Sequence, residues 1–283
     1  MLTAAVIATS TGGTVTAGDP RTALNGFSID SRTVQAGDLF FAIVAARDGH
    51  EFVEAALEGG AAGAVVHSTQ RRAFRRPAND PVIIQVADTT AALQDLGRFV
   101  RRESGARVVA ITGSAGKTTT KETIAEFLAG SYRVVRNKGN LNNHLGLPLS
   151  LLELRHGADL AVMELGMNHA DEIRLLVSIA EPDVRVWTNV GDAHLGHFES
   201  REAIADAKSE ILERVQTGDV LICNADDPLV MARVDSFGGA RLTFGLSADA
   251  DVRGAAVQDL GLDGTRLTVH TPGGEVEMHT PLL

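Results

Sequence analysis

The hydrophobic pattern of the first 85 residues predicts a small α/β unit. Short apolar runs suited to buried strands alternate with one segment of helical spacing, which stops at a Gly-Gly pair. The strand candidates are 38–44, 64–66 and 82–86, and the helix candidate is 51–57. After this unit, apolar residues recur every three or four positions up to Glu103. They predict a connecting helix that Thr89 or Thr90 can cap.

From position 107 the pattern changes to a repeated sequence of strand, loop and helix. This alternation predicts a mostly parallel sheet with helices on both faces, and the last part of the chain predicts a β-hairpin. The strand candidates are 107–111, 160–164, 184–189 and 220–224. The helix candidates are 118–128, 172–179 and 201–215, and the hairpin strands are 266–271 and 275–280.

The predicted fold class is therefore α/β, with a small N-terminal α/β domain followed by a domain with a mostly parallel sheet. We expect the N-terminal domain at 1–85, the connecting helix at 86–105 and the second domain at 106–283. In parallel sheets of this kind, ligands bind at the carboxyl ends of the strands. Functional residues are therefore expected where strands end.

Composition and charge narrow the class of protein. The chain has 283 residues, of which 44% are hydrophobic, and this is enough for two globular domains. No apolar run approaches the roughly 18 residues of a membrane span, and no signal peptide is expected. The net charge of −10 argues against nucleic acid as a partner. The single cysteine, Cys223, fits a reducing, cytoplasmic compartment, and a monomer is expected. The basic cluster is expected to be a solvated loop, and it consists of Arg71, Arg72, Arg75 and Arg76.

The strongest chemical signal is a glycine-rich loop between a predicted strand and a predicted helix. Its residues are Gly113, Ser114, Ala115, Gly116, Lys117, Thr118 and Thr119. Glycines let backbone N–H groups turn towards phosphate oxygens, Lys117 supplies positive charge, and the Thr118 hydroxyl can hold Mg²⁺. The common phosphate loop has four residues between its glycines, whereas this one has two. A tight turn that happens to contain a lysine is the alternative.

A second group of polar residues follows the next strand candidates. Glu164 ends an apolar strand, where an unpaired carboxylate would be costly to bury. A Mg²⁺ ion would explain it, since such sites combine one or two carboxylates with phosphate oxygens, and an ion pair is the alternative. Asp192 and His194 could reach the same metal. The spacing of His194 and His197 suggests zinc, but no Cys or further His lies nearby to complete a tetrahedral set.

Other polar positions are ambiguous when taken alone. Lys208 lies on an amphipathic helix candidate, where a lysine is usually a solvated surface residue. Asn142 and Asn143 lie in a loop that suits either ligand contacts or a turn. Asn224 follows a strand, where it could reach the base or ribose of a nucleotide or form part of a plain turn.

Five strings occur in the order and with the spacing seen in the Mur ligases: TGSAGKTTTKE, GNLNNHLGLPLSLL, MELGMNHADEI, NVGDAHLGHFES and AKSEIL. The strings IDSR at 29–32 and GDLF at 37–40 also resemble the first domain of that family. The resemblance covers essentially the whole chain. GNLNNHLGLP and GMNH resemble the branch of the family that adds D-alanyl-D-alanine.

This resemblance implies an ATP-dependent amide ligation in the synthesis of peptidoglycan precursors. The γ-phosphate would move to the terminal carboxylate of UDP-N-acetylmuramoyl tripeptide, and the amine of D-alanyl-D-alanine would then displace phosphate. Positioning and charge neutralisation would be the main contributions of the protein. Domain 1–85 would bind the UDP-substrate, and domain 106–283 would bind ATP and Mg²⁺.

The resemblance also implies roles for single residues. Lys117 would balance phosphate charge, Thr118 and Glu164 would share one Mg²⁺, and His194 would bind a second metal ion. Lys208 would match a lysine that the family carbamylates, which turns a cation into an anionic oxygen ligand. Lys117, His194 and Lys208 are thus the catalytic candidates. Residues expected towards the substrates are Asp30, Ser31, Arg32, Asn142 and Asn143 for the UDP-substrate and Asn224 for adenine.

Two departures from the family pattern leave alternatives open. Asp171 stands where the family usually has glycine, either as a local change of the loop or as a helix cap. The family continues into a C-terminal ligase domain that we expect to be absent here. The chain could therefore be a binding module for ATP and the UDP-substrate without turnover, or a Mur ligase that adds a different amino acid. An unrelated phosphate-loop kinase or GTPase would leave the strings around Glu164 and His194 unexplained.

Overall fold

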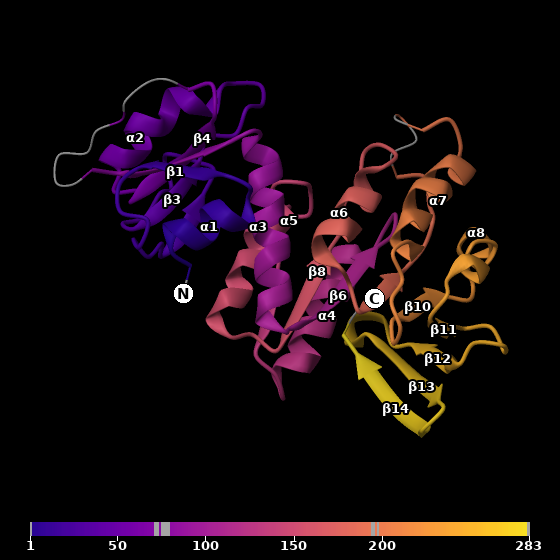
Figure 1. The fold of residues 1–283 in the computed structure, drawn as a ribbon. Helices are drawn as coiled ribbons and strands as arrows, with labels where there is room; N and C mark the ends of the chain where they lie inside the picture. The colour runs from indigo at the N-terminus through magenta and orange to yellow at the C-terminus, as the bar shows by residue number, and fades with distance from the viewer. Residues whose placement is uncertain (1, 71–73, 75–79, 194–195, 197, 282–283) are drawn as a thin grey trace. The chain divides into compact units, whose positions relative to one another are not determined.

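The computed structural model describes residues 2–70, 74, 80–193, 196 and 198–281. The chain forms two compact units, each with its own sheet (Figure 1). The first unit comprises Met1–Ala106 and Asn137–Ala161, and the second comprises Arg107–Arg136 and Val162–Leu283. Among the described residues, no helix has the length and apolar character needed to cross a membrane.

The first unit is built on a five-stranded sheet in the order β1-β5-β4-β3-β2. Strands β2 to β5 pair in parallel, and β1 is antiparallel to β5 at the edge. The strands are β1 (Thr14–Ala17), β2 (Gly26–Ser28), β3 (Asp38–Phe41), β4 (Gly63–His67) and β5 (Val82–Val86). The helices are α1 (Ala4–Ser10), α2 (Val53–Glu58), α3 (Thr89–Ser104) and α5 (Gly146–Leu151), with the 3-10 turns η1 (Gly49–Phe52) and η2 (Leu152–His156).

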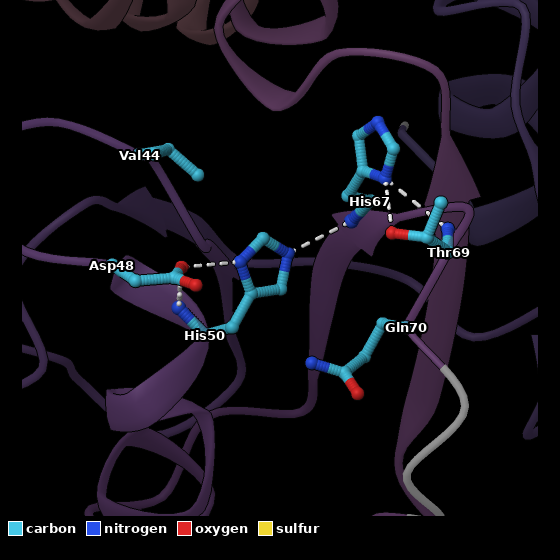
Figure 2. A pocket seen from close by; sticks show the side chains of 6 residues that line it. All are labelled: Val44, Asp48, His50, His67, Thr69 and Gln70. Carbon is cyan, nitrogen blue, oxygen red and sulfur yellow. Dashed lines mark hydrogen bonds and ion pairs between the residues drawn. The ribbon is translucent and has the colours of Figure 1, made fainter.

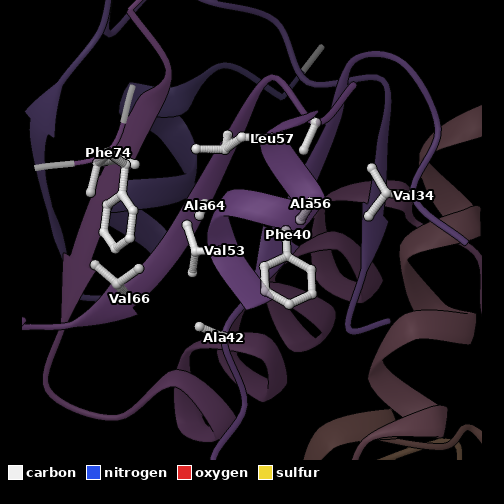
Figure 3. Close-up of a cluster of buried hydrophobic side chains, with 11 residues drawn as sticks. Val34, Phe40, Ala42, Val53, Ala56, Leu57, Ala64, Val66 and Phe74 are labelled. Atoms are coloured by element: carbon white, nitrogen blue, oxygen red, sulfur yellow. The ribbon is translucent and has the colours of Figure 1, made fainter. Parts of the chain in front are cut away.

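Apolar side chains from β3, β4 and α2 form the core of this unit (Figure 3). Phe40 and Val66 come from the two strands, and Val53 and Leu57 lie one helical turn apart on α2. All four side chains are almost completely buried, and each such burial contributes roughly 1.5–3 kcal/mol to folding. The packing fixes the segments that follow β3 and β4.

Helix α3 begins after an aspartate. The sequence predicts a cap at Thr89 or Thr90. In the structure, Asp88 Oδ1 accepts hydrogen bonds from the N–H groups of Thr90 and Ala91 at 2.7 and 2.9 Å. The predicted cap is therefore wrong, because the Thr89 hydroxyl instead donates to the carbonyl of Ala42 at 2.9 Å. A carboxylate at this position also interacts favourably with the helix dipole.

The second unit is built on a nine-stranded, mostly parallel sheet in the order β14-β13-β12-β11-β10-β9-β6-β8-β7. Strands β6, β9, β10, β11 and β12 pair in parallel, and β13 and β14 continue the sheet in antiparallel pairing. The strands are β6 (Arg107–Thr112), β7 (Val134–Arg136), β8 (Leu160–Glu164), β9 (Val184–Trp187), β10 (Val220–Asn224), β11 (Ala240–Gly245), β12 (Val252–Asp259), β13 (Thr265–Thr271) and β14 (Gly274–Thr280). The helices are α4 (Lys117–Ala129), α6 (Glu172–Ala180), α7 (Arg201–Ser209) and α8 (Pro228–Met231), with the 3-10 turns η3 (Glu210–Leu212), η4 (Val234–Ser236) and η5 (Gly261–Asp263).

This architecture confirms the predicted α/β class and the mostly parallel second sheet. The predicted hairpin is confirmed as β13 and β14, and the single cysteine, Cys223, is buried in β10. Hydrophobic periodicity missed β7, β11 and β12, because their burial is incomplete and their polar residues hide the pattern. The predicted solvated loop containing Arg71, Arg72, Arg75 and Arg76 lies outside the described residues.

The grouping into compact units differs from the domain limits that the sequence suggests. Helix α3, predicted as a connector, belongs to the first unit and packs against α5 and η2. The segment Asn137–Ala161 also belongs to this unit, although the chain on either side of it belongs to the second. The limits 1–85, 86–105 and 106–283 stay a prediction, since compactness alone does not define a functional domain.

Arg185 on β9 is the largest buried cation of the second unit, with 1% of its side chain exposed. Its Nη1 donates to Asp219 Oδ2 at 2.7 Å, its Nε to the carbonyl of Ile211 at 2.8 Å, and its Nη2 to the carbonyl of Glu213 at 3.2 Å. These bonds satisfy a charge that would be costly to bury alone. They also use carbonyls that a longer α7 would have needed. The predicted helix 201–215 is therefore too long.

Helix α6 begins after a residue in the left-handed region. Asp171 has φ 68° and its side chain makes no capping hydrogen bond, so the interpretation of its side chain as the helix cap is wrong. Glu210 from η3 accepts hydrogen bonds from the N–H groups of Asp171 at 2.8 Å and Arg174 at 2.9 Å. Glycine would adopt this backbone conformation without steric cost.

Replacing Asp219 by alanine is expected to lower the free energy of unfolding by about 3–5 kcal/mol, because it leaves Arg185 charged and without its carboxylate in the interior. The control is Asp235→Ala, which removes an exposed ion pair with Arg241 and should cost about 0–1 kcal/mol. Urea unfolding measures both. Equal losses of unfolding free energy in the two variants would show that the buried ion pair contributes no more to stability than the exposed one.

The backbone at Asp171 gives a second prediction. Asp171→Gly should be more stable than Asp171→Ala by about 1–2 kcal/mol, because only glycine avoids the left-handed steric cost. Both variants lose the ion pair between Asp171 and Arg174, so that contribution cancels in the comparison. Urea unfolding of the two proteins side by side is the measurement. If the two variants have the same free energy of unfolding, residue 171 does not adopt the left-handed conformation.

Candidate functional site

The glycine-rich loop joins the end of β6 to the start of α4. Gly113 has φ 156°, and a Cβ there would collide with Thr188 Oγ1, so a larger residue does not fit. Gly116 has φ 76° and precedes α4 without any side-chain cap. The first N–H groups of α4 therefore have no side-chain acceptor from the capping position. Together with the helix dipole, they form the arrangement that binds anions.

Lys117, the first residue of α4, lies over this loop. Its ammonium donates to the carbonyls of Gly113 at 2.8 Å and Ser114 at 3.4 Å. Burial lowers the pKa of Lys117 from its ordinary value, and the nearby carboxylate of Glu164 acts in the opposite direction. The lysine is thus folded back on the loop, close to where negative charge would be bound.

The side chain of Asn189, just after β9, clamps the middle of the loop. Its Oδ1 accepts from the N–H of Ala115 at 2.9 Å, and its Nδ2 donates to the carbonyl of the same residue at 3.1 Å. The Thr188 hydroxyl donates to that carbonyl at 2.9 Å. Sequence reasoning missed this role. The sequence did show that Thr188 and Asn189 are two polar residues at the end of the predicted strand 184–189. That strand pairs with β6, which leads into the loop.

Thr118, near the start of α4, and Glu164, at the end of β8, supply two neighbouring oxygen atoms. The Thr118 hydroxyl donates to Glu164 Oε2 at 2.8 Å, and Glu164, at the end of β8, is only 4% exposed. Hydroxyl and carboxylate oxygens are the donors that Mg²⁺ prefers, and phosphate and water usually complete its shell. Within the described part of the chain, no group of three or more His, Cys, Asp or Glu could hold a metal ion. The donor set fits Mg²⁺ bound together with a phosphate.

Lys208 on α7 is buried, with 1% of the residue exposed. The usual interpretation of a helical lysine as a surface residue is therefore wrong here. Burial and, to a smaller extent, the positive charge of Lys117 lower the pKa of Lys208 to about 7. No hydrogen bond or ion pair to its ammonium group is recorded among the residues that the structure describes. An unpaired buried amine of this kind is unusual and marks a functional candidate.

Two other candidates of this unit, Asp192 and Asn224, make polar contacts with other side chains or carbonyls. Asp192 is exposed and forms an ion pair with Arg201 at 2.5 Å, which lowers the pKa of its carboxyl. Asn224 Nδ2 donates to the carbonyl of Thr188 at 2.9 Å, so this amide ties β10 to the end of β9. His194 and His197 lie outside the described residues, and the metal role of His194 stays a prediction.

The substrate candidates Asp30, Ser31 and Arg32 form a tight turn after β2 in the first unit. Arg32 donates to both oxygens of Asp30, at 2.9 and 2.6 Å, and this bonding lowers the pKa of Asp30 to about 2. Asn143 Oδ1 accepts from the N–H of Gly146 at 2.8 Å, at the start of α5. Asn142 lies beside it in the same loop. These five candidates belong to the first unit, and their role in binding substrate stays a prediction.

A cavity of about 300 Å³ opens after β3 and β4 of the first unit (Figure 2). His50 Nδ1 lies 2.6 Å from Asp48 Oδ1, and His50 Nε2 accepts from the N–H of His67 at 2.9 Å. Because Nε2 accepts this bond, Nδ1 is the ring nitrogen that can donate to Asp48. Hydrogen bonds from the backbone N–H and then the ring of His50 lower the pKa of Asp48. The turn at Asp30 does not line the cavity.

The pKa of Lys208 gives a pH prediction. Between about pH 7 and pH 10, the unfolded chain carries a proton on this amine that the folded chain lacks, so the contribution of Lys208 to stability improves as pH rises. Lys208→Met removes this dependence. The variant should therefore exceed the original protein in stability by a few kcal/mol near pH 6.5, and this gain should shrink near pH 9.5.

Urea unfolding in buffer depleted of CO₂ measures this difference at each pH. Lys138→Met, at an exposed position, controls for the loss of one positive charge. A gain for Lys208→Met that is the same at both pH values would mean that the amine is not held neutral in the fold.

Comparison with known proteins connects this geometry to a family. Residues 111–283 match the family description "Mur ligase middle domain", and residues 23–101 match "Mur ligase family, catalytic domain". The chain is 38% identical over 252 residues to the UDP-N-acetylmuramoyl-tripeptide–D-alanyl-D-alanine ligase of Bacillus subtilis, covering 88% of this chain and 53% of that protein. The Escherichia coli enzyme of the same name is 36% identical over 263 residues, with coverage of 92% and 56%.

Solved structures agree with the sequence comparison. MurF from Acinetobacter baumannii has a TM-score of 0.88 and 33% identity, covering 99% of this chain and 60% of that one. MurF ligase from Thermotoga maritima, solved in complex with ADP, has a TM-score of 0.77 and 30% identity, covering 90% and 58%. The chain spans about half the length of the curated relatives it matches. The family descriptions match most of the chain, at residues 23–101 and 111–283. This chain therefore belongs to the Mur ligase family.

Proposed function

We propose that this chain carries the ATP-binding and UDP-substrate-binding parts of a ligase that joins D-alanyl-D-alanine to UDP-N-acetylmuramoyl tripeptide. The observation that carries the proposal is the hydrogen bond of Thr118 to Glu164 beside Lys117 and an uncapped helix start. This combination suits the binding of a nucleoside triphosphate together with Mg²⁺. The identity to relatives that carry this name supports the choice of substrates.

The proposed reaction has two steps. A terminal carboxylate oxygen of the tripeptide attacks the γ-phosphorus of ATP, the bond to the β,γ-bridging oxygen breaks, and ADP leaves. The resulting acyl phosphate is then attacked by the amine of D-alanyl-D-alanine. A tetrahedral intermediate forms and releases inorganic phosphate, and the amine loses a proton to give the amide. A carboxylate is a poor electrophile, and conversion of its oxygen into phosphate provides a good leaving group.

The residues of this chain would contribute position and charge. Lys117 and the first N–H groups of α4 would bind the outer phosphates, and Asn189 would hold the loop in shape around them. Thr118 and Glu164 would hold Mg²⁺, which supplies charge neutralisation at the transferring phosphate. These contributions suit a reaction in which the protein mainly aligns reactants and stabilises negative charge.

Lys208 is proposed as the lysine that becomes carbamylated. A neutral amine is the form that adds to CO₂, and the product is a carbamate with loss of a proton. The burial of Lys208 and its pKa of about 7 keep a large share of the amine neutral under ordinary conditions. The carbamate would place a negative charge near Lys117, where a protonated Lys208 would instead be repelled.

The first unit is proposed to bind the UDP-substrate. Its cavity after β3 and β4 lies at the carboxyl ends of parallel strands, where ligands bind in such sheets. The fixed Asp48–His50 pair would form a rigid wall of this site. We further propose a cytoplasmic protein, since its single cysteine is a buried free thiol. A monomer is proposed as well.

Two other functions are candidates. One is a binding module that holds ATP and the UDP-substrate without turnover. A ligase that adds a different amino acid is the other candidate. A diaminopimelate-adding ligase shares the fold at a TM-score of 0.62 and 23% identity.

The test is ATP-dependent phosphate release by the 283-residue chain with Mg²⁺, UDP-N-acetylmuramoyl tripeptide and D-alanyl-D-alanine, each omitted in turn. Release that requires both substrates supports the ligase. Binding of ATP and the UDP-substrate by calorimetry without release supports the binding module. Absence of binding for both compounds would overturn the proposed function.

Replacement of Glu164 should separate the metal from the nucleotide. In Glu164→Gln, the affinity for ATP in the presence of Mg²⁺ should fall by about tenfold or more, which corresponds to at least roughly 1.4 kcal/mol. Affinity without Mg²⁺ should stay the same or rise, because a negative charge beside the phosphates is removed. Calorimetry measures both, with Glu126→Gln on the exposed side of α4 as the control. Equal losses with and without Mg²⁺ would contradict the metal role of Glu164.

A further inference from the structure

The loop of residues 165–171 connects the candidate metal ligand Glu164 to helix α6. Its first N–H group, that of Leu165, donates to the carbonyl of Ile111 at 2.8 Å. In its middle, the N–H groups of Asn168 and His169 donate to a carboxylate oxygen of Glu172, at 2.5 and 3.2 Å. Glu172 belongs to the helix that follows the loop. These bonds alone would let the loop and α6 move together.

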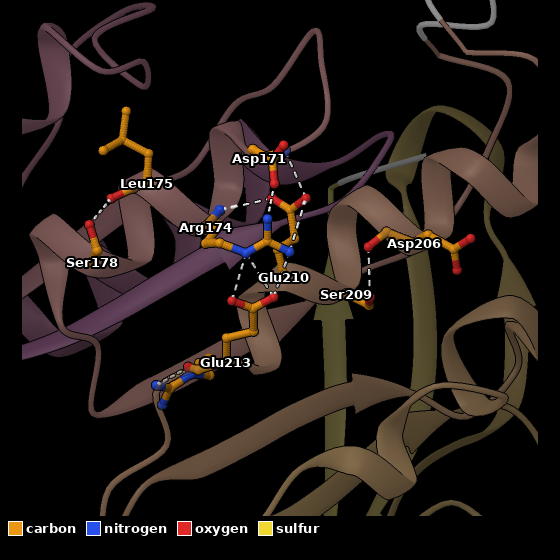
Figure 4. Close-up of polar contacts among 9 residues, drawn as sticks. Asp171, Arg174, Leu175, Ser178, Asp206, Ser209, Glu210 and Glu213 are labelled. Atoms are coloured by element: carbon orange, nitrogen blue, oxygen red, sulfur yellow. Dashed lines mark hydrogen bonds and ion pairs between the residues drawn. The ribbon is translucent and has the colours of Figure 1, made fainter.

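Glu210 is the residue that ties the end of this loop to a different part of the chain. One carboxylate oxygen accepts from the N–H of Asp171 at 2.8 Å, and the other accepts from the N–H of Arg174 at 2.9 Å (Figure 4). The residue is 5% exposed. Burial raises the pKa of Glu210, and the N–H group and the charge of Arg174 act against this rise. A carboxylate this deep is retained at a cost that its two backbone bonds offset.

Glu210 lies close to Lys208 in the sequence. It follows Lys208 by two residues, at the point where α7 passes into η3. The same carboxylate therefore connects the segment that carries Lys208 with the loop that begins at Glu164. The two candidate metal ligands come from segments far apart in the chain, and Glu210 is a direct link between these segments.

We propose that Glu210 is a positioning residue: its carboxylate holds the loop 165–171, and with it the carboxylate of Glu164, in a fixed place relative to Lys208. The expected effect on Mg²⁺-dependent ATP binding rests on the proposed function. The expected effect on the mobility of the loop does not. Neither the family strings nor the roles they imply assign any function to Glu210.

The neighbouring Glu213 provides a matched comparison. It lies on the same polar cluster and accepts from Arg174 Nε at 2.8 Å, but it bonds no backbone N–H group of the loop in the part of the chain that the structure describes. Its side chain is 40% exposed, whereas that of Glu210 is 6% exposed. Removal of either carboxylate takes away one negative charge near Arg174. Only removal of Glu210 takes away the bonds to the loop and to the start of α6.

The experiment compares Glu210→Gln with Glu213→Gln in the full 283-residue chain. Amide hydrogen exchange is followed for the loop 165–171. In Glu210→Gln, exchange should accelerate about tenfold or more across the loop, because an NH2 group, which cannot accept, replaces one of the two accepting oxygens. In Glu213→Gln, exchange of the loop should be unchanged. Glu210→Asp, which keeps the charge on a shorter side chain, should give an intermediate rate, and it replaces Glu210→Gln if that variant does not fold.

A second readout separates positioning from simple stabilisation. ATP affinity is measured by calorimetry with and without Mg²⁺. Glu210→Gln should lower the affinity with Mg²⁺ several-fold and leave the affinity without Mg²⁺ unchanged, and Glu213→Gln should change neither. Accelerated exchange confined to the N–H groups of Asp171 and Arg174, with an unchanged effect of Mg²⁺, would overturn the proposal, because Glu210 would then only cap α6.

The outcomes also distinguish this proposal from the proposed function. If the unsubstituted protein binds no ATP, this result counts against the proposed function. Exchange across the loop then still decides the role of Glu210, since it needs no ligand. Equal acceleration in Glu210→Gln and Glu213→Gln would show a general charge effect and would refute the positioning role.

Discussion

The parallel pairing of β6 with β9 is the contact on which the candidate site depends. The two strands pair in register from Val109 and Val184 to Thr112 and Trp187. Because both run in the same direction, their carboxyl ends meet at one edge, at the strand spacing of roughly 4.8 Å. The loop after β6 and the polar pair after β9 are thereby brought within hydrogen-bonding distance. A shift of the register by one residue would turn the side chains to opposite faces and separate them.

Once the strands are paired, a small number of polar contacts gives the loop its shape. Asn189 bonds both backbone groups of Ala115, and the Thr188 hydroxyl leaves room only for a glycine at position 113. Thr118 then faces Glu164 at the end of the strand on the other side of β6. The geometry of the loop is therefore held from both neighbouring strands. It does not depend on the loop sequence alone.

Two buried cations of the second unit show how differently a fold can treat charge. Arg185 has a carboxylate and several carbonyls around it, and its burial is compatible with stability. Lys208 is buried as deeply, and no ion pair is recorded for it among the described residues. Its lowered pKa reflects a cost that the fold accepts. Costs of this kind tend to occur where chemistry requires them, and Glu210 links this position to the loop after Glu164.

Sequence alone determined the class of the fold, and it predicted the chemistry of the glycine-rich loop. Alternation of apolar strands and amphipathic helices is a local property, and the loop from Gly113 to Thr119 carries its donors within a few consecutive residues. The identity of Glu164 as a buried strand-end carboxylate was also readable, because a charge at the end of an apolar run is conspicuous. The strings that resemble the Mur ligases added the implied role of Lys208, which no local pattern indicates.

Only the tertiary structure decided which side chains meet. The clamp by Asn189, the cap of α6 by Glu210 and the early end of α7 all depend on partners that lie tens of residues away in the sequence. Helical periodicity places Lys208 on a surface, and packing against neighbouring elements places it in the interior. Periodicity reports the average environment of a segment. The burial and the partners of a single polar atom are set by the packing of distant segments, which local sequence patterns do not encode.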